Sequence, residues 1–188
     1  MPEVRVDRDL VERARQSDRD AFAVLVHQFS DSLFAVAYRI LRDPGLAEDA
    51  LQNALVLTWR RLPTLRDPDR FEAWVHRILV HACYDESKRA RPWRALVTVL
   101  PTEQLSAPDG TSTIVDRDEL ERAFLRLSVE QRAVFVLHHY IGLPLVEVAE
   151  LLDIPAGTAR SRLHYAIAGL RTALTAVAEP IAREGRLA

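Results

Sequence analysis

The chain has 188 residues, of which 48% are hydrophobic and 28% are charged, and its net charge is −2. This length allows one domain or two small ones, and the composition supplies a core and excludes wholesale disorder. The charge excludes a protein that coats nucleic acid by bulk attraction, so any binding of DNA would have to come from local basic patches.

Several features argue against export or membrane insertion. Cys83 is the only cysteine, which excludes an internal disulfide and fits a reducing cytoplasm. Residues 1–9 are charged and lack a hydrophobic signal core. The best candidate for a membrane span, residues 133–152, is interrupted by two histidines, a proline and two glutamates. We therefore expect a cytoplasmic protein.

Periodic apolar residues predict helices in the first part of the chain. The first long helix carries an apolar stripe from Phe22 to Ile40, with Asp18 or Asp20 as its N-cap and residues 43–45 at its end. A second helix is expected at about residues 47–62. Its expected apolar stripe consists of Leu51, Leu55, Trp59 and Leu62.

A loop with two prolines, residues 63–69, precedes the next predicted helix. Asp69 and Glu72 have the spacing of a capping box at its start. A basic cluster from Lys88 to Arg94 lies at its end. Trp74 on this helix, like Trp59 before it, lies on an apolar stripe, so we interpret both as core residues.

The composition changes after Pro92, and residues 95–115 lack periodicity, which predicts an interdomain linker. Helical signals resume at Asp116, and Ser128 with Gln131 predicts a capping box. The sequence thus predicts an all-α protein. Its two small helical domains would be residues 1–94 and 116–176, joined by a flexible linker and followed by a tail at 177–188.

Residues 145–174 are typical of a helix, a tight turn and a second helix. Val148, Ala149 and Leu152 are expected to face inward, and the small Ala149 allows close helix crossing. The second helix is expected to bury Ala159, Leu163, Ala166 and Leu170. Its other surface carries Arg160, Ser161, Arg162, His164 and Arg171.

No acidic residue occurs between Asp153 and Glu179, although the chain is acidic overall. A helix whose first half is small, polar and basic fits the major groove of DNA. The alternative is an ordinary surface helix that happens to be basic.

Two parts of the chain resemble one protein family. Residues 143–164, with the core Pro-x-Gly-Thr-x-x-Ser-Arg-Leu-His at 155–164, resemble the fourth conserved region of extracytoplasmic-function (ECF) sigma factors of bacterial RNA polymerase. Residues 47–53 and 70–78 resemble the polymerase-docking helix and the promoter-melting helix of region two. The matches come in family order, and the resemblance covers about residues 9–174.

The resemblance implies a subunit that directs core RNA polymerase to promoters, promotes DNA opening and catalyses nothing itself. The implied partners are the β′ clamp and β flap of polymerase and promoter DNA. Asp49, Gln52 and Asn53 form one polar stripe at i, i+3 and i+4, and the resemblance implies that this stripe docks on the β′ clamp. A merely solvated face is the alternative.

The resemblance also assigns DNA contacts. Capturing a melted minus-ten strand needs a base pocket and a basic track. The implied minus-ten residues are Leu65, Arg66, Arg77, His81, Lys88, Arg89 and Arg91. The implied minus-thirty-five residues are Thr158, Arg160, Ser161, Arg162, His164, Tyr165 and Arg171.

Some positions depart from the family pattern. His81 stands where the family usually has Asn, Tyr165 and Ile167 stand where Arg is frequent, and Asn53 replaces a common acidic residue. The effect of these departures on promoter preference stays open. So does the presence of an anti-sigma partner, which holds many members of the family inactive.

We identify no catalytic motif and expect no cofactor. His76, His81 and Cys83 are close in sequence, but their spacing does not place three ligands on one helical face, so no metal site is expected.

Two other functions remain open at this point. A stand-alone helix-turn-helix regulator would bind duplex operator DNA as two half-sites. A protein-interaction module whose DNA-binding helix has decayed would dock on polymerase without specifying a promoter.

Overall fold

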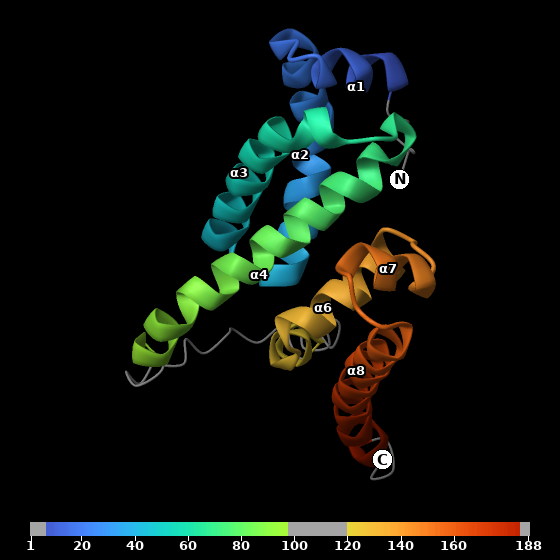
Figure 1. Cartoon of the computed structure of the whole chain (residues 1–188). Coiled ribbons are helices and arrows are strands. Elements are labelled where there is room, and N and C mark those ends of the chain that lie inside the picture. Colours follow the sequence, from blue (N-terminus) through green and yellow to red (C-terminus); the bar gives the residue numbers. More distant parts are fainter. Residues whose placement is uncertain (1–6, 98–119, 185–188) are drawn as a thin grey trace. The chain divides into compact units, whose positions relative to one another are not determined.

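The computed structural model describes the backbone of residues 7–97 and 120–184 and the side chains of residues 7–91 and 120–175. Within these ranges the regular elements are helices and no strand occurs, which confirms the predicted all-α class (Figure 1). Contacts between Cα atoms divide the chain into two compact units, one comprising Met1–Ala90 with Ala149–Asp153 and the other Arg91–Val148 with Ile154–Ala188. We call them the N-terminal and the C-terminal unit. The predicted linker lies largely outside the described residues.

The N-terminal unit is a bundle around one long helix. Its elements are α1 (Arg8–Arg15), α2 (Arg19–Leu41), α3 (Pro44–Arg61), the 3₁₀ turns η1 (Leu62–Thr64) and η2 (Pro68–Arg70), and α4 (Phe71–Val97). Both α1 and α3 pack against α2. The rings of Phe29 on α2 and Phe71 on α4 meet edge to face, with centroids 5.9 Å apart. Figure 1 shows α4 running obliquely beside α2 and α3.

The apolar stripe of α2 forms the centre of this bundle. Leu25, Leu33, Val36 and Ile40 are at most 1% exposed. Asp18 is the N-cap, because its Oδ1 accepts a hydrogen bond of 3.0 Å from the Ala21 N–H. By length and composition alone α2 could cross a membrane, which we had not expected of this segment. Its apolar face is buried in the bundle, as in a core helix of an ordinary domain.

The start of α3 differs from the prediction. Asp43 Oδ1 accepts a hydrogen bond of 3.0 Å from the Leu46 N–H, and Pro44 occupies the first turn, so α3 begins three residues before the predicted position. Residues 43–45 therefore belong to the start of α3 and not to the end of α2. Helix α2 ends at Leu41, and the next residue, Arg42, is its left-handed C-cap.

The predicted apolar stripe of α3 is also wrong in part. The buried residues of α3 are Ala47, Ala50, Ala54 and Thr58. Leu51, Leu55 and Trp59 are only half-buried, whereas Leu62 is buried in η1. Small side chains let the backbones of packed helices approach closely, so the alanine face turns inward and the larger residues flank it.

The cap before α4 is a third difference. Asp67, and not Asp69, caps this region: its Oδ1 accepts a hydrogen bond of 3.0 Å from the Asp69 N–H, and η2 continues directly into α4. The Asp69 carboxylate instead accepts a hydrogen bond of 3.2 Å from Arg8. The predicted capping box of Asp69 with Glu72 is therefore wrong.

The second part of the described chain contains a helix at residues 120–126, α6 (Val129–Phe135), the π-helical turn η3 (Val136–Tyr140), α7 (Leu145–Leu152) and α8 (Ala156–Glu184). The predicted capping box is confirmed, with Gln131 N–H donating to Ser128 Oγ and Ser128 N–H donating to Gln131 Oε1. Gly142 adopts a φ of +89°, and this left-handed residue marks the predicted break before α7.

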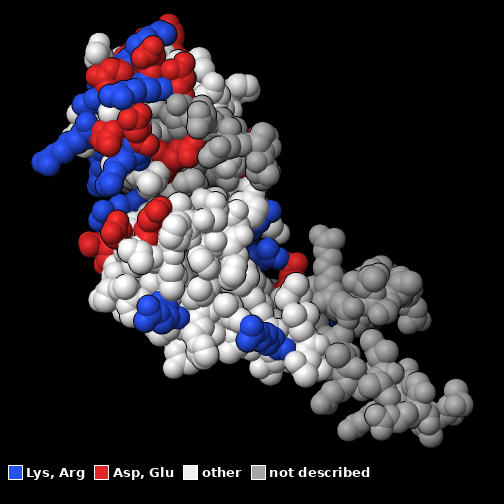
Figure 2. Space-filling view, turned by 90° about the vertical axis from the view of Figure 1, so that its right-hand side faces the viewer, with Lys and Arg blue, Asp and Glu red and all other residues white. Residues whose placement is uncertain are grey.

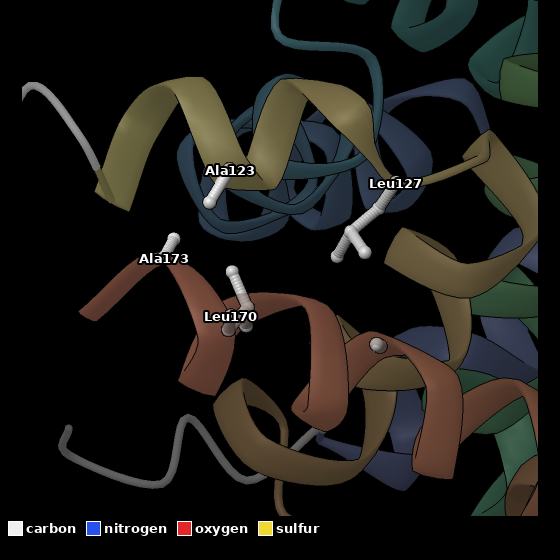
Figure 3. Packing of buried hydrophobic residues seen from close by; sticks show 5 residues of the cluster. Ala123, Leu127, Leu170 and Ala173 are labelled. Carbon is white, nitrogen blue, oxygen red and sulfur yellow. The ribbon is translucent and has the colours of Figure 1, made fainter. Parts of the chain in front are cut away.

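The helix at residues 120–126 packs against α8. Figure 3 shows Ala123 and Leu127 pointing toward Leu170 and Ala173 of α8, and all four side chains are buried. The rings of Phe124 and Phe135 pack beside this cluster in a T-shaped pair, with centroids 5.4 Å apart. This core fixes the long helix that carries the candidate DNA-reading residues.

Candidate nucleic-acid and protein interfaces

A tight turn at residues 153–155 joins α7 to α8. Asp153 has a left-handed φ of +56°, which ends α7. The Pro155 carbonyl accepts hydrogen bonds from the N–H groups of Thr158 at 2.8 Å and Ala159 at 3.1 Å, which start α8. On α7 the predicted inward-facing residues Val148, Ala149 and Leu152 are buried. The helix-turn-helix predicted from the sequence is therefore present.

The first turns of α8 present a polar and basic surface. Ala159, Ala166 and Leu170 are buried as predicted, and Leu163 is half-buried. Arg160, Ser161, His164, Tyr165 and Arg171 are exposed, and Thr158 and Arg162 are half-buried. The predicted minus-thirty-five residues thus have surface available for DNA.

Two details modify this surface. The Ser161 hydroxyl donates a hydrogen bond of 3.0 Å to the Thr158 carbonyl, so its oxygen is the group that can accept a bond from a ligand. Tyr165 is 63% exposed, and its ring lies edge to face with that of His164. A large exposed aromatic ring therefore stands in the middle of the basic surface.

Charged side chains are concentrated in part of the described surface. On the face drawn in Figure 2, basic and acidic side chains gather in one area, and much of the remaining described surface there carries neither sign. This distribution agrees with the net charge of −2 and leaves DNA attraction to particular helices.

The loop before α4 and the first half of α4 carry the predicted base pocket. Arg66, Arg77 and His81 are exposed, and the last two are four residues apart on one face of α4. Leu65 is only 6% exposed and its N–H donates to the Leu62 carbonyl. Leu65 therefore has little surface for a base in this conformation, and Arg66 is the accessible member of that pair.

The ring of His81 is expected to be neutral near pH 7. Partial burial, and next the positive charge of Arg77, lower the pKa of His81. A neutral imidazole has one donor nitrogen and one acceptor nitrogen. It can therefore either donate a hydrogen bond to a base edge or accept one from it.

The second half of α4 carries the predicted basic track. Lys88, Arg89 and Arg91 are exposed. Arg89 Nη1 donates a hydrogen bond of 2.7 Å to Glu86 Oε1, so its guanidinium is held at one end. The side chain of Arg94 lies outside the described residues.

The predicted docking stripe is exposed on α3. Asp49, Gln52 and Asn53 all have accessible side chains, opposite the alanine face that packs inward. Asn53 also forms an interaction within the domain, because its Nδ2 donates a hydrogen bond of 2.7 Å to Glu86 Oε1. That bond joins α3 to α4 and was not predicted.

An apolar groove adjoins this stripe and was missed by the sequence reasoning. It has a volume of about 560 Å³ and lies between α2 and α3. Its lining residues are Arg19, Phe22, Val26, Leu55, Val56, Trp59 and Arg60. Trp59 packs on Phe22, with ring centroids 4.9 Å apart, but it is only half-buried and lines the groove rather than the core. The available signal was a surplus of large apolar residues on α3, more than one face can bury.

The remaining titratable candidates have structural environments. Burial raises the pKa of the Cys83 thiol to about 12, which makes it a poor nucleophile and metal ligand. His138 Nδ1 lies 2.8 Å from the Leu143 carbonyl oxygen, at the break before α7. Within the described residues, no three His, Cys, Asp or Glu side chains are grouped to hold a metal ion.

Two family models match the chain. Sigma-70 region 2 matches residues 25–92, and Sigma-70 region 4 matches residues 117–168. The RNA polymerase sigma-E factor of Streptomyces coelicolor is 36% identical over 82% of this chain and 86% of its own length. The ECF RNA polymerase sigma factor SigM of Mycobacterium tuberculosis is 33% identical over 88% of this chain and 83% of its own length.

Solved structures of sigma factors have a similar fold. CnrH, in complex with the cytosolic domain of CnrY, is 26% identical, with a TM-score of 0.62 over 90% of this chain and 97% of that one. The sigma factor RpoE of Bartonella quintana, in complex with the anti-sigma factor NepR, has a TM-score of 0.63 at 24% identity over 82% of this chain and 96% of that one. The latter likeness shows the fold alone.

Both conserved regions thus occur in one chain, in family order and with relatives along most of its length. This excludes the stand-alone regulator, which would not carry region 2. The chain belongs to the ECF sigma factors, the subunits that direct bacterial RNA polymerase to promoters.

Proposed function

We propose that this sigma factor divides promoter recognition between its two units. The exposed face of α3 docks on the β′ clamp of core polymerase, and the C-terminal unit docks on the β flap. The loop before α4 and α4 itself capture the opened minus-ten strand, and α8 reads the minus-thirty-five duplex. The observation that carries this proposal is the exposure of the predicted residues on both α3 and α8, beside faces that are buried.

The composition of the α3 surface supports docking on a protein. Asp49, Gln52 and Asn53 offer hydrogen-bonding groups, and the groove beside them is lined mostly by apolar side chains. Protein interfaces combine an apolar centre with a polar rim. We therefore include Val56 and Trp59 in the proposed docking surface.

For the minus-ten strand, Arg66, Arg77 and His81 are the proposed pocket residues. Lys88, Arg89 and Arg91 are proposed to follow its phosphates. Binding unpaired bases lowers the cost of DNA opening, because the opened state is stabilised by contacts that the duplex cannot make. The protein would need no catalytic group for this role.

Docking is tested with a double variant of the full chain, Asp49→Ala with Gln52→Ala. We expect its affinity for core polymerase to fall by about tenfold or more, because two interfacial polar groups are lost. The matched control is Gln28→Ala with Asp31→Ala, which removes an exposed Gln and Asp of the same spacing from α2. Fluorescence titration of core polymerase provides the measurement, and equal affinity of the two double variants would refute the assignment of α3.

Run-off transcription tests the function as a whole. Core polymerase with this chain is expected to start transcription at specific members of a promoter library, whereas the chain that lacks polymerase should bind promoter duplexes weakly. Polymerase association without any promoter-specific transcript would instead favour the interaction module whose DNA helix has decayed.

We further propose an anti-sigma partner and a cytoplasmic location. CnrH, which is similar to 90% of this chain, is seen bound to a partner protein, the cytosolic domain of CnrY. Affinity purification of the tagged full chain from its own cells, followed by mass spectrometry, tests whether the chain has an anti-sigma partner. A partner that blocks run-off transcription when added back would support the proposal, and recovery of polymerase subunits alone would contradict it.

A further inference from the structure

Glu86 on α4 is a carboxylate in an unusual environment. Only 6% of the residue is exposed, and no other Asp or Glu among the described residues is buried to this degree. Burying a carboxylate is costly unless hydrogen bonds replace its water. Its environment is therefore expected to contain specific partners, and it does.

A single oxygen atom of Glu86 holds two side chains from different helices. Oε1 accepts a hydrogen bond of 2.7 Å from Asn53 Nδ2 on α3 and another of 2.7 Å from Arg89 Nη1 on α4. Asn53 and Glu86 are 33 residues apart in sequence, so this is a tertiary link. It joins the helix that we propose docks on polymerase to the helix that we propose holds DNA.

Both partners of Glu86 keep groups free for a ligand. The Arg89 side chain is 70% exposed, and a guanidinium has five N–H donors, so it can bind a phosphate while one nitrogen stays on Glu86. The Asn53 side chain is also exposed, and its Oδ1 is a second polar atom beside the bonded Nδ2. Glu86 thus fixes the orientation of two surface groups without itself reaching the surface.

We propose that Glu86 is a positioning residue that couples polymerase docking through Asn53 to capture of the minus-ten strand through Arg89. This inference rests on the proposed roles of α3 and α4. Holding a flexible arginine in place removes part of the ordering entropy that a phosphate contact would otherwise cost. Polymerase bound at Asn53 acts on the same carboxylate, so docking and strand affinity are linked.

The choice of residue at position 53 is part of this arrangement. An amide donates to the Glu86 carboxylate, whereas a second carboxylate there would repel it. Asn53→Asp is therefore expected to weaken strand capture although the new side chain has nearly the same shape. A docking residue that acted only on polymerase would not have this effect on DNA.

The first test uses holoenzyme assembled from core polymerase and full-length variants. The probe is the fluorescein-labelled non-template strand of a promoter that wild-type holoenzyme transcribes. Glu86→Gln keeps the shape of the side chain and removes its charge, and we expect strand affinity to fall about 3- to 10-fold. In an Arg89→Ala background the same change is expected to have little further effect, because Glu86 acts through Arg89.

A control separates positioning from simple stability. Ile40→Val removes one methylene from the core of the same unit and does not touch Glu86, so it lowers stability without altering the link. Its strand affinity is expected to equal that of the wild type. If Ile40→Val weakens strand binding as much as Glu86→Gln does, or if the effects of Glu86→Gln and Arg89→Ala multiply in full, the proposal is overturned.

A second measurement avoids changes at the buried site. Asn53→Ala and Arg89→Ala alter two exposed side chains that bond to the same oxygen atom. Coupling through Glu86 predicts that their effects on strand affinity do not multiply, and independent sites predict that they do. Failure of wild-type holoenzyme to bind the strand at all would instead overturn the proposed function, so the two failures are distinguishable.

Discussion

At the scale of single residues, several histidines lie in surroundings that favour their neutral form. Burial lowers the pKa of His76 below the ordinary value of 6.5, although a hydrogen bond to the Glu72 carbonyl opposes this effect. Burial and the neighbouring His138 also lower the pKa of His139. These rings are neutral in the folded chain at pH 7, and protonating them works against folding.

The pH dependence of stability follows from this shift. Because the unfolded chain binds the proton of His76 more readily, its contribution to stability is present above about pH 6.5. This contribution of neutral His76 to the free energy of unfolding is lost as the pH falls below 6.5. The loss amounts to at most about 1.4 kcal/mol per pH unit, and it ends at the lower pKa that His76 has in the folded chain. The variant His76→Gln should therefore show a smaller loss of stability between pH 7 and pH 5.

Urea unfolding monitored by tryptophan fluorescence measures this, since Trp59 and Trp74 both lie in the N-terminal unit. The matched control is His27→Gln, on an exposed position of α2. An identical pH slope in wild type and His76→Gln would show that another group controls the acid sensitivity. The slope should be reduced and not abolished, because His81 also has a lowered pKa.

At the scale of elements, helix starts in this chain depend on single side chains. Asp18, Asp43 and Ser128 each accept a hydrogen bond from a backbone N–H in the first turn of their helix. Ser128→Ala removes the cap of α6 and should cost about 1 kcal/mol. Hydrogen exchange of the amides of residues 129–135 in the full chain should accelerate about fivefold.

The control for this cap is Thr172→Ala. Thr172 is exposed, and its hydroxyl donates to the Ala168 carbonyl inside α8, so its loss leaves no N–H without a partner. Its exchange pattern in α6 should match the wild type. Unchanged protection of α6 in Ser128→Ala would mean that tertiary packing alone holds this helix start.

Gly169 shows how closely two elements approach. A Cβ at this position of α8 would lie 3.4 Å from Leu127 Cδ2. Gly169→Ala is expected to raise stability by about 0.5–1 kcal/mol, because alanine is the better helix former and the new contact is close to ordinary van der Waals distance.

The larger change Gly169→Leu places a branched side chain against Leu127 and should be less stable than Gly169→Ala by about 1 kcal/mol. Urea unfolding followed by circular dichroism gives both values. The matched control is Gly157→Ala in the first turn of α8, where a Cβ meets nothing within 4 Å. Equal stability of Gly169→Leu and Gly169→Ala would contradict the close approach of Leu127 to α8 at this position.

At the scale of the whole molecule, the proposed binding surfaces lie on helices in separate units. The N-terminal unit carries the α3 and α4 surfaces, and the C-terminal unit carries α8. If the proposed function holds, promoter affinity is the sum of a duplex contact and a single-strand contact, and each can be changed by itself.

The duplex contact predicts a particular salt dependence. Arg160→Ala with Arg162→Ala should weaken holoenzyme binding to promoter duplex, and the slope of log K against log salt should fall by up to about 2, as expected for two lost phosphate contacts. Arg126→Ala is the control, because it removes one exposed arginine outside α8. Titrations at several salt concentrations that gave parallel lines for the double variant and the wild type would contradict the assignment of α8.

The sequence by itself determined the helical class, the helix-turn-helix, the capping box at Ser128 and the membership of a family. Each depends on neighbours in the chain: hydrogen bonds between residues four apart, caps within the first turn, and motifs of contiguous residues. The site residues that the resemblance implied remain predictions, and the structure adds only that most of them are exposed.

Tertiary structure alone decided which of the competing faces is covered. The alanines of α3 turn inward and leave Trp59 on a groove with Phe22, and Leu65 packs inside while Arg66 stays outside. Asn53 meets Glu86 across 33 residues. Periodicity identifies an apolar stripe but not the helix that will cover it, because burial depends on partners that are distant in the sequence.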